Sequence, residues 1–185
     1  MTLSTPVPPY ALSLLPIRRI VTGHTPDGMA TVIRDERLTP VPDVPNVPDS
    51  GRITRIWTTK QSPVVHSDET VDGGTGGPDR LGLVSTNGTN IGSFDVAPGN
   101  GVPRHRTSTI DYIILISGEL TAVLEDGTER TLSEPGTILV QRGTLHKWEN
   151  RGPGWVRFLA VLVDAKPVEI VDKEGKTEVL KEGFA

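Results

Sequence analysis

The sequence predicts an all-β protein, a double-sheet jelly roll or small barrel with little or no helix. Short runs rich in β-branched and aromatic residues recur along the chain, and 20 glycines and 16 prolines separate them. No segment is a convincing helix. The length of 185 residues suggests one domain with extra length at the ends, and 35% hydrophobic residues are enough for one core.

Composition excludes several classes of function. The net charge is −4, the pI is about 5.6, and no basic run is present, so nucleic acids and anionic membranes are poor partners. The absence of cysteine excludes disulfides, zinc–thiolate sites and thiol nucleophiles. The longest apolar run, Phe158 to Val163, is far shorter than the ~20 residues of a membrane helix. The N-terminus lacks a basic leader region, so a cytoplasmic protein is expected.

The first third of the chain predicts an arm, a hairpin and an irregular connector. Residues 1–16 carry four prolines and form the expected extended arm, ahead of a barrel domain over 17–165 and a strand or hairpin tail over 166–185. The remaining predictions are strands at 17–23 and 30–34, a polyproline-like connector at 39–49 that cannot be a central strand, a strand at 52–59, and a glycine-rich loop at 61–80 that is a candidate lid. In the 52–59 strand, alternation places Arg55 and Trp57 on one face.

The remainder of the chain is more regular. Asp126-Gly127 is a strong signal for a two-residue hairpin. Glycine and proline turns separate expected strands at 91–96, 104–117, 120–124, 129–132, 137–140, 146–149, 155–163, 168–171 and 177–180.

Two histidines mark the candidate site. His105 and His146 lie on either side of the run of short strands, and Asp111 lies between them. Strand–turn–strand spacing of this kind can bring both imidazoles and the carboxylate into the mouth of one barrel. Such a cluster forms either a metal site or an acid/base site.

The segment 99–150 resembles the cupin superfamily. The first cupin motif matches Gly99, His105, Thr107, Asp111 and Gly118, and the later part of the second motif matches Gly143, His146 and Asn150. His-Arg-Thr…Asp-Tyr and Val-Gln-Arg-Gly-Thr-x-His-x-Trp-x-Asn further resemble a subgroup of single-domain cupins found near small-molecule and polyketide biosynthesis genes. The resemblance implies a cupin jelly-roll barrel.

This chain departs from the cupin metal-binding pattern. Thr107 replaces the second histidine of the first motif, and Asp111 replaces its glutamate. The resemblance therefore implies two histidines and one carboxylate, His105, His146 and Asp111, a set that can hold a divalent metal such as Fe, Zn, Mn or Ni. Alternation predicts that His105, Thr107 and Asp111 share one inward strand face, with His146 opposite.

Other side chains are candidates for binding the substrate. Trp148 and Trp57 can stack on a planar molecule, although an aromatic residue in a small barrel more often belongs to the core. Arg55 and Arg142 can pair with a carboxylate, although such residues are more often surface charges. The remaining candidates are Gln141 as a polar donor and Thr107 as a hydroxyl lining the pocket, while His24 and His66 are expected to be bystanders.

The leading functional prediction is a lyase or isomerase of secondary metabolism. It would catalyse decarboxylation, dehydration or a double-bond shift on a carboxylated, possibly aromatic polyketide, with His146 as general acid/base and His105 assisting. The alternatives are a non-haem Fe(II) dioxygenase using His105, Asp111 and His146, and a non-catalytic small-ligand-binding protein. A homodimer is expected, with the arm and the tail covering open sheet edges.

Overall fold

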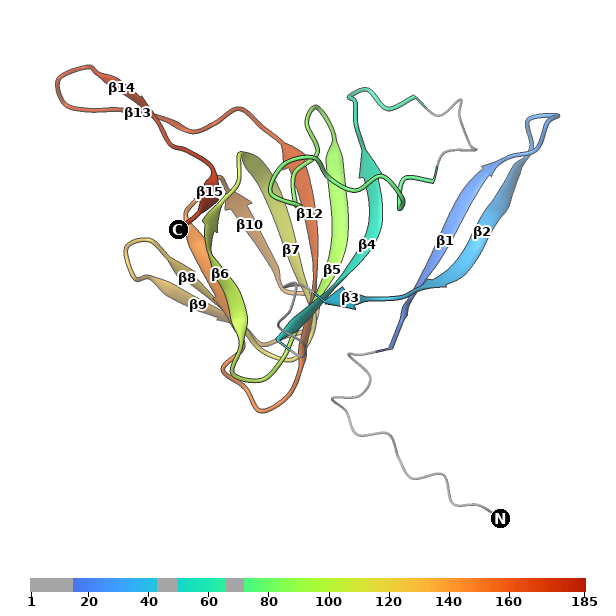
Figure 1. Ribbon diagram of the computed structural model, residues 1–185, viewed down its shortest axis with the longest axis horizontal. Helices are drawn as coiled ribbons and strands as arrows, with labels where there is room; N and C mark the ends of the chain where they lie inside the picture. Colours follow the sequence, from blue (N-terminus) through green and yellow to red (C-terminus); the bar gives the residue numbers. More distant parts are fainter. Residues whose placement is uncertain (1–14, 43–49, 66–71) are drawn as a thin grey trace, which may run out of the picture.

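The computed structural model describes residues 15–42, 50–65 and 72–185, and over these ranges the chain is all β (Figure 1). Two sheets face each other around the core. The larger has the strand order β10-β7-β12-β5-β4-β3. Its strands are β3 (Val41–Pro42), β4 (Gly51–Thr59), β5 (Thr89–Val96), β7 (Thr109–Ser117), β10 (Ile138–Arg142) and β12 (Val156–Asp164). The predicted fold class is confirmed.

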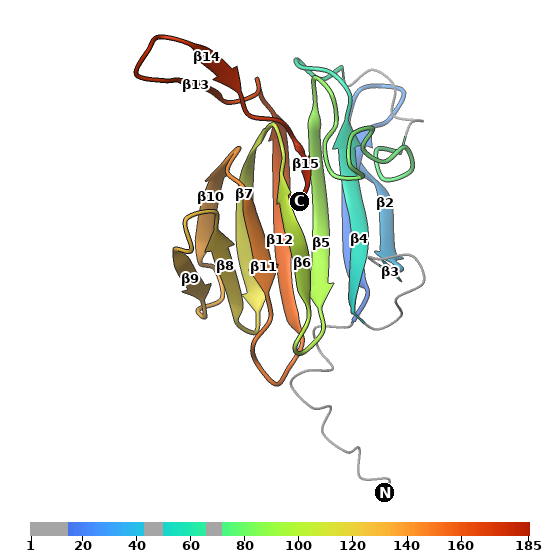
Figure 2. The same ribbon diagram turned by 60° about the vertical axis from the view of Figure 1, so that its left-hand side comes forward.

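The second sheet has the order β15-β6-β11-β8-β9 and carries both candidate histidines. Its strands are β6 (Gly101–Arg106), β8 (Leu120–Leu124), β9 (Glu129–Leu132), β11 (His146–Glu149) and β15 (Gly183–Phe184). Two separate hairpins complete the architecture, β1 (Ile17–His24) with β2 (Ala30–Leu38), and β13 (Glu169–Val171) with β14 (Thr177–Val179). The β13–β14 hairpin projects from the barrel, whereas the β1–β2 hairpin lies beside β4, where Arg19 donates to the Ile56 carbonyl oxygen (Figures 1 and 2).

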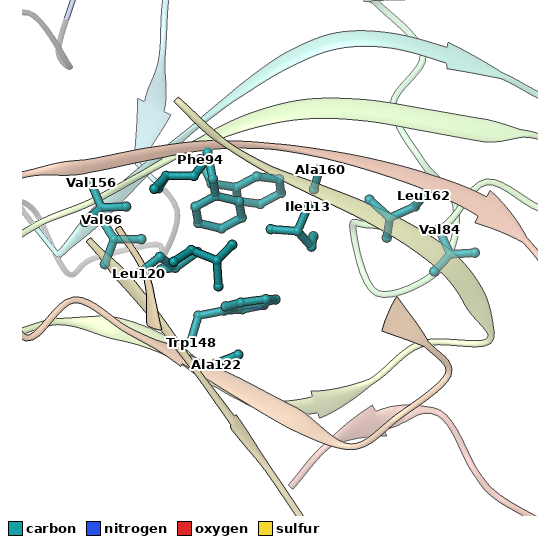
Figure 3. Close-up of a cluster of buried hydrophobic side chains, with 13 residues drawn as sticks. Val84, Phe94, Val96, Ile113, Leu120, Ala122, Trp148, Val156, Ala160 and Leu162 are labelled. Carbon is teal, nitrogen blue, oxygen red and sulfur yellow. The ribbon is translucent and has the colours of Figure 1, made fainter. Parts of the chain in front are cut away.

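The core lies between the two sheets. Phe94 and Phe158 of the larger sheet stack with ring centroids 5.2 Å apart, and Trp148 of the smaller sheet lies 5.8 Å from Phe158. Figure 3 shows Trp148, Leu120 and Ala122 facing the aromatic and aliphatic side chains of the opposite sheet. Apolar burial of this kind supplies most of the stability of a sandwich, at roughly 25 cal/mol per Å².

Two glycine turns fix the register of the strands around the site. Gly127 has φ 85° and lies in the turn of the β8–β9 hairpin. The structure corrects the predicted two-residue turn to a three-residue loop over 125–127, because Leu124 N–H donates to the Thr128 carbonyl oxygen. Gly118 has φ 82°, and a Cβ at this position would lie 2.8 Å from the Trp155 carbonyl oxygen. A side chain at position 118 is therefore excluded both by backbone conformation and by contact.

The structure corrects the prediction of one strand at 104–117. The chain breaks at Thr107-Ser108 and crosses from β6 in the smaller sheet to β7 in the larger. His105 and Asp111 consequently belong to opposite sheets, although both remain buried and line the same cavity. The prediction that His105, Thr107 and Asp111 share one strand face was wrong because it assumed uninterrupted alternation.

A β-bulge changes the expected faces of β4. The register against β5 shifts between Arg55 and Trp57, which breaks the two-residue alternation. Trp57 therefore does not share the inward face of Ile53 and Arg55. Its ring instead lies under the guanidinium of Arg19, 5.7 Å from the Cζ atom.

The predicted irregular segments lie partly within the described residues. Val41–Pro42 pairs with β4 at the sheet edge, a position that tolerates proline. Residues 1–14, 43–49 and 66–71 lie outside the described residues and include most of the predicted arm, much of the connector, part of the candidate lid, and His66. Within the described ranges, no helix has the length and apolar character needed to cross a bilayer.

The outer face of β7 and β10 is apolar. Val140 pairs with Tyr112 across the two strands, and the exposed apolar side chains here include Tyr112, Ile116, Ile138 and Val140. Contiguous apolar patches on a protein surface mark interaction sites.

We expect the protein to form a homodimer that uses this face, and strand addition by the arm and tail also stays a prediction. Val140→Lys should shift the dimer towards monomer because a charge would then be buried at the interface. Light scattering across a dilution series measures this shift, with Val65→Lys as a matched exposed control. A wild-type protein that is monomeric at every concentration would contradict the prediction.

Candidate active site

A cavity of about 270 Å³ opens at one end of the barrel between the two sheets. His105, His146 and Asp111 are its titratable groups with buried side chains, and Arg55 stands exposed in its lining. The remaining walls are mostly apolar and aromatic: Ile53, Leu81, Leu83, Phe94, Val102, Pro103, Ile113, Trp148, Phe158, Ala160, Leu162 and Phe184. A few polar groups in an apolar cleft are typical of a small-molecule site.

Strand pairing brings the two histidines together. His105 of β6 is the direct cross-strand partner of His146 of β11, and the ring centroids are 4.3 Å apart at an angle of 56°. Cross-strand partners point to the same face of a sheet, so both rings enter the barrel. The side chains are 5% and 2% exposed. Trp148 meets the His146 ring edge-on at 5.4 Å and completes an aromatic floor.

Both rings are held in the same way by the backbone. His105 Nδ1 lies 2.8 Å from the Pro103 carbonyl oxygen, and His146 Nδ1 lies 2.9 Å from that of Thr144. A carbonyl oxygen only accepts, so the hydrogen bond assigns the proton to Nδ1 in each ring. In the neutral imidazole, Nε2 then carries a lone pair. The site thus presents two adjacent basic nitrogens.

Burial keeps both rings neutral at physiological pH. It lowers the pKa of His146 to about 4, the neighbouring His105 adds to this effect, and the hydrogen bond to Thr144 opposes it. Burial also lowers the pKa of His105, against the opposing hydrogen bond to Pro103. Two cationic rings at this separation would repel in an apolar environment.

Asp111 faces the cavity from the opposite sheet. Thr109 Oγ1 donates to Thr107 Oγ1 over 2.7 Å, and Thr107 Oγ1 donates to Asp111 Oδ2 over 3.3 Å. Oδ1 is buried and has no hydrogen-bond partner among the described residues. Burial raises the pKa of Asp111 to about 6, although the hydrogen bonds from Thr109 and Thr107 oppose the change. The pocket therefore combines two bases with one carboxyl group that is protonated at mildly acidic pH.

The structure places the other predicted residues in three groups. Trp148 and Arg55 line the histidine pocket, and Thr107 lies behind Asp111 as its hydrogen-bond donor. Gln141 and Arg142 line a second cavity between β10 and the β8–β9 hairpin, called the seam cavity below. Trp57 and His24 are not among the described residues that line the histidine pocket.

Sequence reasoning missed Phe184. Strand β15 pairs with β6 so that Phe184 lies opposite His105, with ring centroids 5.4 Å apart, while the side chain stays 54% exposed at the pocket mouth. Arg80 forms ion pairs with Asp164 and Glu182 and fastens the tail beside this mouth. Pairing between strands so distant in sequence leaves no local signal.

The residues present do not fit the predicted three-ligand metal site. Among the described residues, no three His, Cys, Asp or Glu side chains lie close enough together to hold one metal ion. The two Nε2 atoms can supply two ligands, but Asp111 lies on the opposite sheet. The structure thus offers two of the three predicted ligands to one metal ion, and binding of a divalent metal stays a prediction.

This fold and pocket define a cupin-type barrel, and comparisons with known proteins agree. The cupin domain family matches residues 92–162. The cupin-domain-containing oxidoreductase virC of Hypocrea virens is 32% identical over 157 residues, which are 83% of this chain and 79% of that protein. Phomopsin biosynthesis cluster protein D of Diaporthe leptostromiformis is 41% identical over 93 residues, 50% of this chain and 49% of that protein. The chain belongs to the cupin family.

The polyketide cyclase RemF of Streptomyces resistomycificus aligns with a TM-score of 0.45 at 17% identity, covering 68% of this chain and 72% of that protein. The matched part of the chain spans about half the length of the phomopsin cluster relatives.

The buried carboxyl predicts a pH-dependent effect of Asp111→Asn. The pKa of Asp111 is raised from 3.8 to about 6 in the folded state. The free energy of unfolding of the wild-type protein therefore falls as the pH rises from about 3.8 to about 6. An amide does not titrate, and the variant should be more stable at pH 7 by up to about 3 kcal/mol. The advantage should shrink to nothing near pH 3.5. Denaturant unfolding at several pH values measures it, and a difference independent of pH would refute the raised pKa.

Proposed function

We propose that the protein is an enzyme of secondary metabolism that moves protons on a small, flat substrate. The observation that carries the proposal is the pair of neutral imidazoles whose Nε2 atoms face one apolar pocket. A base in such a pocket removes a proton without competition from water. The reaction class is that of a lyase or isomerase: decarboxylation, dehydration or a double-bond shift.

The smaller sheet supplies the bases, and the larger sheet supplies the group that returns the proton. His146 accepts a proton at Nε2, and His105 hydrogen-bonds to, or shares, the same proton from the neighbouring strand. Asp111 can return a proton from the opposite wall when it is protonated, which its pKa of about 6 permits near neutral pH. Trp148 and Phe184 flank the two rings and offer apolar faces to a planar molecule. Arg55 at the rim suits a carboxylate on the substrate.

The relatives support the metabolic setting of this proposal. Two phomopsin cluster proteins and an oryzines cluster protein are named for biosynthetic gene clusters. We extend that setting, but no particular product, to this chain.

A second candidate is an oxidoreductase, because virC and fogC carry that name. It would include the iron dioxygenase that uses His105, Asp111 and His146. Metal analysis and oxygen uptake separate it from the first candidate. A stoichiometric divalent metal that is lost in both His105→Ala and His146→Ala would favour it. A protein that binds the compound and releases it unchanged would instead be a non-catalytic binder.

The decisive experiment follows the mass of the product. Purified protein is incubated with metabolite extracts in H₂O and in D₂O, under air and anaerobically. We expect a product with the mass of its precursor, or that mass less water or carbon dioxide, formed without oxygen. An isomerised or decarboxylated product should also carry solvent deuterium on carbon, because its carbanion is protonated from water. His146→Ala should lower the rate by roughly 10²–10⁴. His24→Ala, outside the pocket, should match wild type. A product that gains oxygen atoms, or needs dioxygen, would overturn the proposal.

A further inference from the structure

We propose that the seam cavity is a second binding site, for a small organic carboxylate with an apolar body. The cavity has a volume of about 230 Å³ and lies between edge strand β10 of the larger sheet and the β8–β9 hairpin of the smaller. Figure 2 shows these three strands side by side at one edge of the barrel. The inference does not depend on the reaction proposed above.

Gln141 is the first observation that points to a ligand. Its side chain lines the cavity and is 2% exposed, yet neither Oε1 nor Nε2 has a hydrogen-bond partner among the described residues. An amide buried without partners is unfavourable because it has lost its hydrogen bonds to water and gained none in return. A bound polar group that accepts from Nε2 removes this cost. The unpaired amide therefore suits a ligand oxygen better than it suits an empty core.

The charge of the lining selects an anion. Arg130 and Arg142 both line the cavity, and no acidic side chain does so among the described residues. Glu129, the nearest acidic neighbour in sequence, is engaged by Arg151 through two hydrogen bonds of 2.7 Å. The described lining therefore carries two positive charges and no negative one, although Arg130 Nη1 also donates to the Glu129 carbonyl oxygen and Arg142 also borders a neighbouring pocket that contains Glu125 and Asp126. Guanidinium groups bind carboxylates through paired, charge-assisted hydrogen bonds.

The rest of the lining requires an apolar body. Leu124 of β8 and Leu139 of β10 are among the aliphatic walls, which also include Ala122 and Val140. The volume is below that of a typical drug-sized pocket, so the ligand is small. A short aliphatic acid or a single-ring aromatic acid combines a carboxylate for Gln141 and the arginines with an apolar body for the aliphatic walls.

The seam cavity adjoins the histidine pocket through two residues. Gln141 is the cross-strand partner of Asp111, and Thr144 lines the seam cavity while its carbonyl accepts from His146 Nδ1. The two cavities share no described lining residue, so one molecule can reach both only if the Gln141 side chain moves aside. Alternatively, a separate carboxylate can occupy the seam alone.

The test uses sodium benzoate as the probe and nitrogen-15 NMR as the readout. The side-chain amide signals of Gln141 are assigned by their loss in Gln141→Leu, a variant that removes an unpaired polar group and should remain folded. Benzoate should move these signals along a saturable curve, and neutral benzyl alcohol should bind at least several-fold more weakly. Arg142→Gln should weaken benzoate binding by roughly fivefold, since the arginine is exposed and its charge is partly screened. Arg37→Gln, on the β1–β2 hairpin, is the matched control and should bind as wild type does.

The histidine ring signals distinguish the two sources of the carboxylate. If they move on the same curve as Gln141, one ligand spans both cavities; if they stay still, the seam binds its ligand alone, and both results support the site. Benzoate that moves only the histidine signals would overturn the inference while leaving the proposed reaction intact. Failure of benzoate to move the Gln141 signals, or unchanged affinity in Arg142→Gln, would also overturn it.

Discussion

The direct pairing of His105 with His146 across β6 and β11 is the constraint on which the site depends. The pairing brings the ring centroids to 4.3 Å and turns both rings into the barrel. Two charged imidazoles at that distance would be strongly unfavourable in an apolar interior, and burial lowers the pKa of each ring, so both are neutral at pH 7. The Pro103 and Thr144 carbonyls then fix which nitrogen carries the proton. Geometry, charge state and tautomer therefore follow from one register.

The crossover at Thr107-Ser108 provides the complementary half of the site. It carries the chain from the smaller sheet to the larger, so that Asp111 approaches the cavity from the side opposite the histidines. The Thr107 hydroxyl, which accepts from Thr109, donates to Oδ2, and Oδ1 has no hydrogen-bond partner in the described part of the chain. A carboxyl group with a raised pKa opposite two neutral bases is an arrangement that separates acid and base roles within one pocket.

Sequence predicted the class of fold and the two histidines because both rest on short-range patterns. Turn glycines such as Gly127 and the spacing around His105 and His146 can be read within a few residues. Long-range pairing and broken alternation cannot. Because of the bulge in β4, Trp57 does not line the pocket, and because β15 pairs with β6, Phe184 does. The seam cavity needs three strands to meet, so neighbouring residues Gln141 and Arg142 gave no sign of a separate site.

The most direct test of this account is a nitrogen-15 NMR titration of the histidine rings in the wild-type protein. We expect His105 and His146 both to carry the proton on Nδ1 at neutral pH, and His146 to stay neutral until the pH approaches about 4. Protonation of His146 near pH 6.5, or a proton on Nε2 of either ring, would contradict the central claim.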